Sequence, residues 1–261
     1  MISKIISNFK NRSVLIALLI TSSTTLSAQE SYEIEVYSSP TTPKNTSIVE
    51  LHSNISPTGP KTESNFTHPL HETVEFTTGI TDNFEIGVYL FNRISNGAFN
   101  YMGSHIRPRV TIPKSWNWFM GTSLSVESGF IKDPLTNEFQ IDYEIRPILD
   151  KTLGKNYISI NPTIDGVLKT KEISFSPNVK YAYEINPKYA LGLEYYGVTG
   201  NPFHWENYDI QTHQFFIVTY LTLDKKHEIE FGIGRGTTLS SDVWNIKLIL
   251  GQRINWIKNK K

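Results

Sequence analysis

The sequence predicts an all-β protein, a transmembrane antiparallel up-and-down β-barrel of about twelve strands. Three observations support this fold class: apolar and polar residues alternate over long runs, charged residues fall on one parity of those runs, and the connections between runs alternate between long and short. Alternation with a period of two gives a strand two chemically different faces. Runs of this length match the roughly 9–11 residues that a tilted strand needs to cross a membrane.

The pattern is clearest between His227 and Ile254. Apolar side chains occupy every second position in its two halves, which flank a turn of small polar residues: Ile229, Phe231 and Ile233, then Trp244, Ile246, Leu248 and Leu250. The positions between them carry acids, lysine, arginine and glycine. One face of each strand is therefore apolar and the other is charged or small.

Composition excludes several other classes. Formal net charge is zero, so no attraction to nucleic acid is implied. Cysteine is absent, which excludes disulfides, zinc–thiolate sites and cysteine nucleophiles. A slightly negative mean hydropathy argues against a bundle of membrane helices but suits a barrel with a polar interior.

The N-terminus reads as a secretory signal over residues 1–28. Lys4, Lys10 and Arg12 precede a short apolar core from Val14 to Ile20, and cleavage is expected after Ala28 although Leu26 is larger than usual. The alternative is an N-terminal membrane anchor, which the short core disfavours. Residues 29–46 are expected to form a periplasmic or plug segment. Its alternating piece, Ser31–Ser39, is a candidate strand that ends before the prolines at 40 and 43.

Residues 47–256 are predicted to form the barrel, and residues 257–261 a basic tail. The expected strands are Ser47–Ile55, Leu70–Gly79, Phe84–Asn92, Gly103–Ile112, Asn117–Gly129, Phe139–Leu149, Tyr157–Leu168, Ile173–Ile185, Tyr189–Val198, Thr212–Leu223, Glu228–Gly236 and Val243–Ile254. Connections after even-numbered strands are expected to be short, and most others long, including Asn92–Met102. Short periplasmic turns and long outer loops are typical of outer-membrane barrels.

The parity of each run divides its residues between two faces. Val74, Ile106 and Ile217 are among the apolar residues expected outside, facing lipid. The residues expected inside are Glu50, His52, Glu75, Glu85, His105, Arg107, Arg109, Glu127, Asp142, Glu144, Arg146, Asp165, Lys180, Glu184, Glu194, Glu228, Glu230, Lys247 and Arg253. Parity alone does not exclude a soluble sandwich or lipocalin-like binder with the opposite orientation, but the signal segment and the strand lengths favour the membrane barrel.

Four prolines lie inside the alternating runs, at positions 108, 147, 162 and 177, all on the outward parity. Proline cannot donate to a sheet ladder and is found mainly at edges and bulges. These positions are therefore expected to be bulges or to lie near the barrel rim.

Several motifs resemble one known family. They are Glu144–Leu149, Ile160–Pro162, Pro177–Tyr183, Leu191–Gly197 and Phe231–Gly236 followed by Ser241–Trp244. In this order and spacing they resemble the outer-membrane transporter family associated with the meta-pathway of phenol degradation, from about Ser47 to the C-terminus. The resemblance implies an outer-membrane β-barrel that passes small, in some cases aromatic, compounds. The loops Thr237–Ser240 and Pro202–Trp205 have no match in the family pattern.

The inward charges have two interpretations. They could form a polar conduit whose charges select solutes, or a lumen closed by ion pairs. The residues proposed for a solute path are Glu75, Glu85, Arg107, Arg109, Glu127, Glu144, Arg146, Lys180, Glu194, Glu230 and Lys247. Inward acids outnumber inward bases, so a weak preference against anions is expected. Phe203, His204 and Trp205 could touch a hydrophobic solute in an outer loop, or only fold that loop.

Other aromatics, among them Trp116, Trp118, Tyr181, Tyr183 and Trp256, are expected to form an interfacial girdle near the short turns.

No enzyme, cofactor or metal site is predicted. His52 and Ser53 are neighbours in a strand, as are Ser104 and His105, so their side chains point to opposite faces and cannot share a proton. The histidines show no metal-ligand spacing. The expected function is passive uptake of small molecules across the outer membrane. The expected partners are outer-membrane lipid and an unidentified small-molecule solute, with no nucleic acid.

Overall fold

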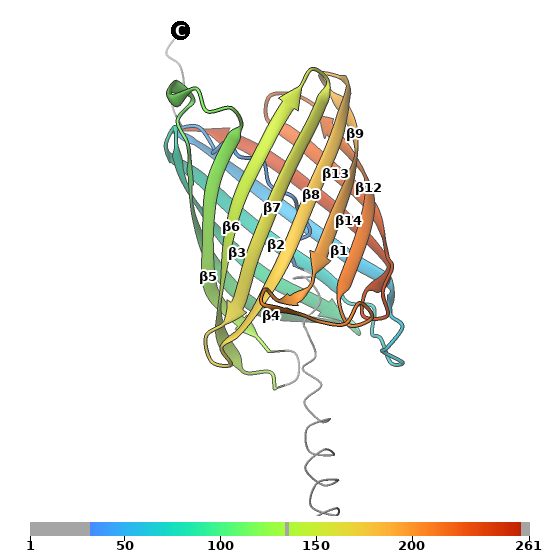
Figure 1. Ribbon diagram of the computed structural model, residues 1–261. Coiled ribbons are helices and arrows are strands. Elements are labelled where there is room, and N and C mark those ends of the chain that lie inside the picture. The colour runs from blue at the N-terminus through green and yellow to red at the C-terminus, as the bar shows by residue number, and fades with distance from the viewer. Residues whose placement is uncertain (1–31, 134–135, 257–261) are drawn as a thin grey trace, which may run out of the picture.

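A computed structural model describes residues 32–133 and 136–256, and shows one closed antiparallel barrel of twelve strands (Figure 1). The predicted signal segment and its cleavage point, and the tail from 257, lie outside the described residues. Among the described residues, no helix is both long and apolar enough to cross a bilayer. The predicted fold class is confirmed.

The strands follow one another around the barrel, and β1 closes it against β14. The barrel strands are β1 Thr46–Pro60, β2 Leu70–Thr81, β3 Phe84–Ser95, β4 Ala98–Thr111, β5 Gly121–Lys132, β6 Phe139–Leu153, β7 Asn156–Val167, β8 Glu172–Asn186, β9 Tyr189–Val198, β12 Thr212–Thr222, β13 His227–Gly236 and β14 Asp242–Asn255. A separate hairpin, β10 Gly200–Asn201 with β11 His204–Trp205, lies in the β9–β12 connection. Because the sheet closes on itself, the barrel has no free edge.

Two connections differ from their expected lengths. Asn117 has a positive φ of 49° after the 3₁₀ turn η1 Lys114–Trp116, so β5 begins only at Gly121. Trp118 and Met120 therefore belong to a connection and not to a strand. The β3–β4 connection, expected to be long, is the two-residue turn Asn96–Gly97, in which both residues have positive φ. Asparagine and glycine tolerate this conformation, so the strands can run on into a tight hairpin.

The prediction that the strand prolines mark bulges or the rim is wrong for Pro147, Pro162 and Pro177, whereas Pro108 does lie near the end of β4. Register shifts occur elsewhere, for example between Ile55 and Thr58, whereas Pro162 pairs directly with Pro177 in the middle of β7 and β8. Pairing between β6 and β7 is interrupted from Ile145 to Leu149 and resumes in the same register. Prolines at 147 and 162 both fall in this interval, and neither has an N–H to donate.

The distribution of side chains is inverted relative to a soluble protein. Apolar side chains such as Ile106, Leu193 and Ile217 are exposed on the outer face, while charged ones such as Arg107, Glu194 and Lys247 are buried inside. Glu184 is the exception among the predicted inward residues: it is exposed near the β8–β9 turn, beside a register shift. A lumen full of ionised groups inside an apolar outer surface is the arrangement of a membrane barrel.

We predict that Ile217→Arg, at the middle of the outer face of β12, lowers the free energy of unfolding by about 2–4 kcal/mol in lipid, because arginine is costly at the bilayer midplane. The matched control Leu223→Arg, just beyond the strand end, should cost about 0–1 kcal/mol. Urea titration in lipid vesicles measures both. Equal costs at the two positions would contradict the placement of this face in the membrane.

Candidate functional site

The lumen contains an inner segment, which we define as residues 32–44. Tyr32 lies at the level of Asn54 and Thr73, whose side chains both donate to its carbonyl oxygen. The segment then runs to the short-turn end, where the Lys44 amide donates to the side chain of Asp82, in the β2–β3 turn. It therefore follows the barrel interior from the level of Asn54 to the β2–β3 turn.

Of the strand expected at Ser31–Ser39, the described residues 32–39 form no strand and join no sheet. Lys44 makes the segment's isolated bridge, to Gly79. Backbone groups of the closed barrel are already paired with neighbouring strands, so the inner segment finds its partners among side chains. At Gly79 the segment comes so close that an added Cβ would collide with the carbonyl oxygens of Thr42 and Pro43.

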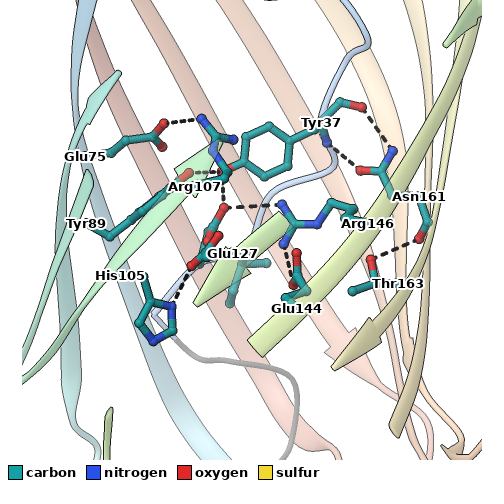
Figure 2. A network of polar contacts seen from close by, with 12 residues as sticks. Tyr37, Glu75, Tyr89, His105, Arg107, Glu127, Glu144, Arg146, Asn161 and Thr163 are labelled. Atoms are coloured by element: carbon teal, nitrogen blue, oxygen red, sulfur yellow. Dashed lines mark hydrogen bonds and ion pairs between the residues drawn. The ribbon is translucent and has the colours of Figure 1, made fainter. Parts of the chain in front are cut away.

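Tyr37 is the residue around which the inner segment is anchored (Figure 2). Its backbone N–H donates to Asn161 Oδ1 at 2.8 Å, and its carbonyl oxygen accepts from Ser159 Oγ at 2.6 Å and from Asn161 Nδ2 at 3.2 Å. The guanidinium carbons of Arg107 and Arg146 lie 4.6 and 4.5 Å from the centroid of its ring. Each such contact contributes about 0.5–2 kcal/mol, more where water is excluded.

The first group of buried charges joins β2, β3 and β4. Arg107 Nη2 lies 2.7 Å from Glu75 Oε1 and 3.4 Å from Glu85 Oε1, and Arg109 Nη2 lies 2.7 Å from the same Glu85 oxygen. Arg109 also donates to the carbonyl oxygens of Ser38 and Pro40, while Glu85 accepts from the amide of Thr42. The barrel charges thus bind each other and the inner segment.

A second group lies on β4, β5 and β6. The two ring nitrogens of His105 face Glu127 at 2.7 Å and Asp142 at 2.8 Å. Arg146 bridges Glu144 of the barrel at 2.7 Å and Glu33 of the inner segment at 3.5 Å (Figure 2).

The third group lies across the lumen on β8, β9, β13 and β14. Lys247 forms ion pairs with both Glu194 and Glu230, and Lys180 approaches the same two carboxylates at 3.2 and 3.6 Å. Tyr196 and Tyr220 both donate their hydroxyl protons to Glu194. Lys247 also donates to the carbonyl oxygen of Ile34, so this group holds the inner segment as well.

A small apolar cluster completes the contact on this side. Ile34 and Val36 of the inner segment pack against Tyr196, Phe216 and Val218. Gly234 is required opposite Phe216, because a Cβ there would collide with the phenyl ring.

All eleven residues predicted for a solute path face the lumen, in these three groups. The residues missed were those of the inner segment and its uncharged partners, Tyr37, Tyr89, Asn161, Tyr196 and Tyr220 among them. The alternation of Glu33 and Glu35 with apolar residues is the available signal, and by itself it predicts a strand. The loop residues Phe203, His204 and Trp205 lie apart, exposed on the small hairpin β10–β11.

A cavity of about 420 Å³ remains between the inner segment and the barrel wall, towards the short-turn end. Its ionisable lining comprises six carboxylates and four cationic groups: Glu35, Glu50, Glu75, Glu85, Glu228 and Glu230, and Arg107, Arg109, Lys180 and Arg253. Among the described residues, Glu35 and Glu50 make no ion pair with lysine or arginine. Carboxyl groups therefore outnumber lysine and arginine side chains in the cavity lining.

The closed twelve-stranded barrel, its apolar outer band and its charged lumen define an outer-membrane β-barrel with the fold of channels and porins. Among solved structures it is similar to the COG4313 outer membrane channel from Pseudomonas putida F1, with a TM-score of 0.60 and 10% identity over 85% of this chain and 100% of that chain. The KdgM porin gives a TM-score of 0.48 at 9% identity, covering 78% of this chain and 98% of that chain. The NanC porin gives a TM-score of 0.49 at 8% identity, covering 78% of this chain and 97% of that chain.

These identities establish likeness of fold alone. No protein-family model matches the sequence, and no curated protein matches it. The resemblance to the transporter family of the phenol meta-pathway is therefore supported as far as an outer-membrane channel fold, and the particular family stays a prediction. The Ser53 hydroxyl donates to Glu72 and not to its neighbour His52, which is buried in the lumen.

We predict that Lys247→Met destabilises the barrel by roughly 3 kcal/mol. Breaking a buried ion pair costs about 3–5 kcal/mol, and the lower end applies because Lys180 still contacts Glu194 and Glu230. The control Lys169→Met breaks the exposed pair with Glu138 and should cost about 0–1 kcal/mol. Denaturant unfolding followed by tryptophan fluorescence compares the free energies of unfolding of the two variants. Similar losses of stability would contradict a buried ion pair at Lys247.

Proposed function

We propose that the protein is a passive outer-membrane channel for small molecules, and that the inner segment is its plug. The observation that carries the proposal is that an outer-membrane channel fold encloses a charged lumen occupied by a separate, non-sheet segment. Hydrogen bonds and ion pairs hold most of this segment, and no β-ladder ties it to the wall. Such a segment can leave its position while every barrel strand stays paired.

The excess of carboxylates in the cavity supports a channel that favours cations over anions. Glu50 is the main contributor on the barrel wall, since it faces the cavity without a lysine or arginine partner among the described residues. Charged rings in a narrow lumen select by sign of charge. The family resemblance supports small solutes and does not decide between polar and aromatic ones.

We predict that Tyr37→Ala raises single-channel conductance in planar bilayers. Losing the ring removes its contacts with Arg107 and Arg146, together about 1–4 kcal/mol. This shifts the equilibrium between the bound and released plug by about fivefold or more, since about 1.4 kcal/mol corresponds to a factor of ten. Tyr183→Ala, on the exposed outer face of β8, is the matched control and should leave conductance unchanged. A barrel that stays closed in Tyr37→Ala, and also after Asn161→Ala is added, would favour the structural barrel with a closed lumen.

We also predict that the reversal potential in a potassium chloride gradient, with EDTA present, shows a preference for potassium that Glu50→Gln reduces. The matched control is Glu172→Gln at the start of β8, which is exposed outside the cavity. Strong selectivity for chloride in the unmodified protein would contradict the proposed role of the cavity carboxylates.

A further inference from the structure

Three side chains converge where the inner segment meets β1 and β2. They are Glu35 of the inner segment, His52 of β1 and Glu75 of β2. One potential ligand atom from each lies within 4.8 Å of the other two. His52 Nε2 is 3.5 Å from Glu75 Oε2, which is too long for a good hydrogen bond.

Glu35 Oε2 has no hydrogen-bond partner among the described residues. His52 Nε2 and Glu75 Oε2 meet only in their 3.5 Å ion pair, and His52 Nδ1, on the other side of the ring, also has no hydrogen-bond partner there. His52 is fully buried and Glu75 is 1% exposed. Leaving buried polar atoms unsatisfied costs about 1–3 kcal/mol each, so a buried cluster held by one long contact requires an explanation.

The neighbours of the three residues direct these atoms inward. Glu75 Oε1 is held by Arg107 at 2.7 Å and by Thr77 Oγ1 at 2.5 Å, which leaves Oε2 turned to His52. Glu50 stands directly opposite Glu75 in the β1–β2 ladder, so a third carboxyl group lies near the point. Lys180, which acts electrostatically on Glu35, is shared between Glu194 and Glu230.

We propose that this point is a binding site for a divalent transition-metal cation such as Zn²⁺, with Glu35, His52 and Glu75 as its protein ligands. One imidazole nitrogen and two carboxylate oxygens form a ligand set that zinc accepts at about 2.0–2.2 Å, with water in the fourth position. Tetrahedral ligands at that radius lie about 3.4 Å apart, which is close to the separation of His52 Nε2 and Glu75 Oε2. The adjoining cavity, which Glu35 and Glu75 line, supplies access and room for the water.

The metal would join the inner segment to the barrel wall. Glu35 belongs to residues 32–44, His52 to β1 and Glu75 to β2. One ion would therefore link the inner segment to two neighbouring barrel strands. The competing arrangement is a protonated His52 that forms ion pairs with Glu35 and Glu75. It satisfies the same charges without any metal, and the two arrangements predict opposite results in a binding experiment.

The test uses the full-length barrel, refolded in detergent and stripped with EDTA, titrated with zinc chloride in a calorimeter. We expect one saturable zinc site per barrel. Glu35→Gln and His52→Gln should each lower its zinc affinity at least about tenfold, since even the loss of a residue that only orients a metal ligand typically costs about 10–100-fold. His105→Gln is the matched control: it removes another buried lumen histidine whose nitrogens face two different carboxylates, and it should retain zinc binding. Because Glu35 lies outside every barrel strand, its variant tests the site even if His52→Gln fails to fold.

A second readout is hydrogen exchange of the peptide that covers residues 32–44, which zinc should slow in the unmodified protein and not in Glu35→Gln. Absence of one-to-one zinc binding, or binding unchanged in Glu35→Gln, would overturn the proposal in favour of the ion-paired histidine. Neither measurement depends on conduction. The proposed metal site can therefore be refuted without refuting the proposed channel, and the proposed channel can be refuted without refuting the metal site.

Discussion

Pairing of buried charge across the lumen is the interaction on which the rest of the structure depends. Arg107, Arg146 and Lys247 are each surrounded by barrel groups, and each of them also contacts the inner segment. Removing one partner of a buried pair costs about 3–5 kcal/mol, far more than a surface pair is worth. The inner segment is thus part of the charge balance of the barrel interior, and its position follows from that balance.

The same constraint explains why the inner segment is held by side chains. A closed barrel leaves no edge to which an additional strand could pair, so the backbone of residues 32–44 finds amides, hydroxyls and carboxylates instead. Asn161, Asp150 and Glu85 each accept a hydrogen bond from a backbone N–H of the segment. Contacts of this kind can break one at a time, whereas a β-ladder would have made the segment a permanent part of the wall.

Charge also divides the lumen into regions of different character. On the β4–β6 side His105 and Arg146 lie within ion-pair distance of carboxylates. On the opposite side Lys180 and Lys247 both form ion pairs with Glu194. Between them, the cavity holds Glu35 and Glu50 without lysine or arginine partners among the described residues. The proposed cation preference and the proposed metal site both lie in this region, because carboxyl groups there outnumber the basic side chains that could pair with them.

The sequence by itself determined the fold class, the strands and the faces. Period-two alternation is a local property, so parity places Glu75, Arg107 and Lys247 on the charged face of their strands. The strand lengths and the signal segment then assign that face to the lumen. The sequence-based prediction was wrong at two kinds of position. Asn117 was expected to begin a strand, but its positive φ places it in a turn before β5. Pro162 was expected at a bulge or the rim, but it lies in the middle of β7, opposite Pro177. Only the tertiary structure decided where residues 32–44 lie and which charges meet. Those contacts join residues far apart in the chain, such as Tyr37 with Asn161 and Glu35 with His52 and Glu75, and no spacing along the sequence encodes them.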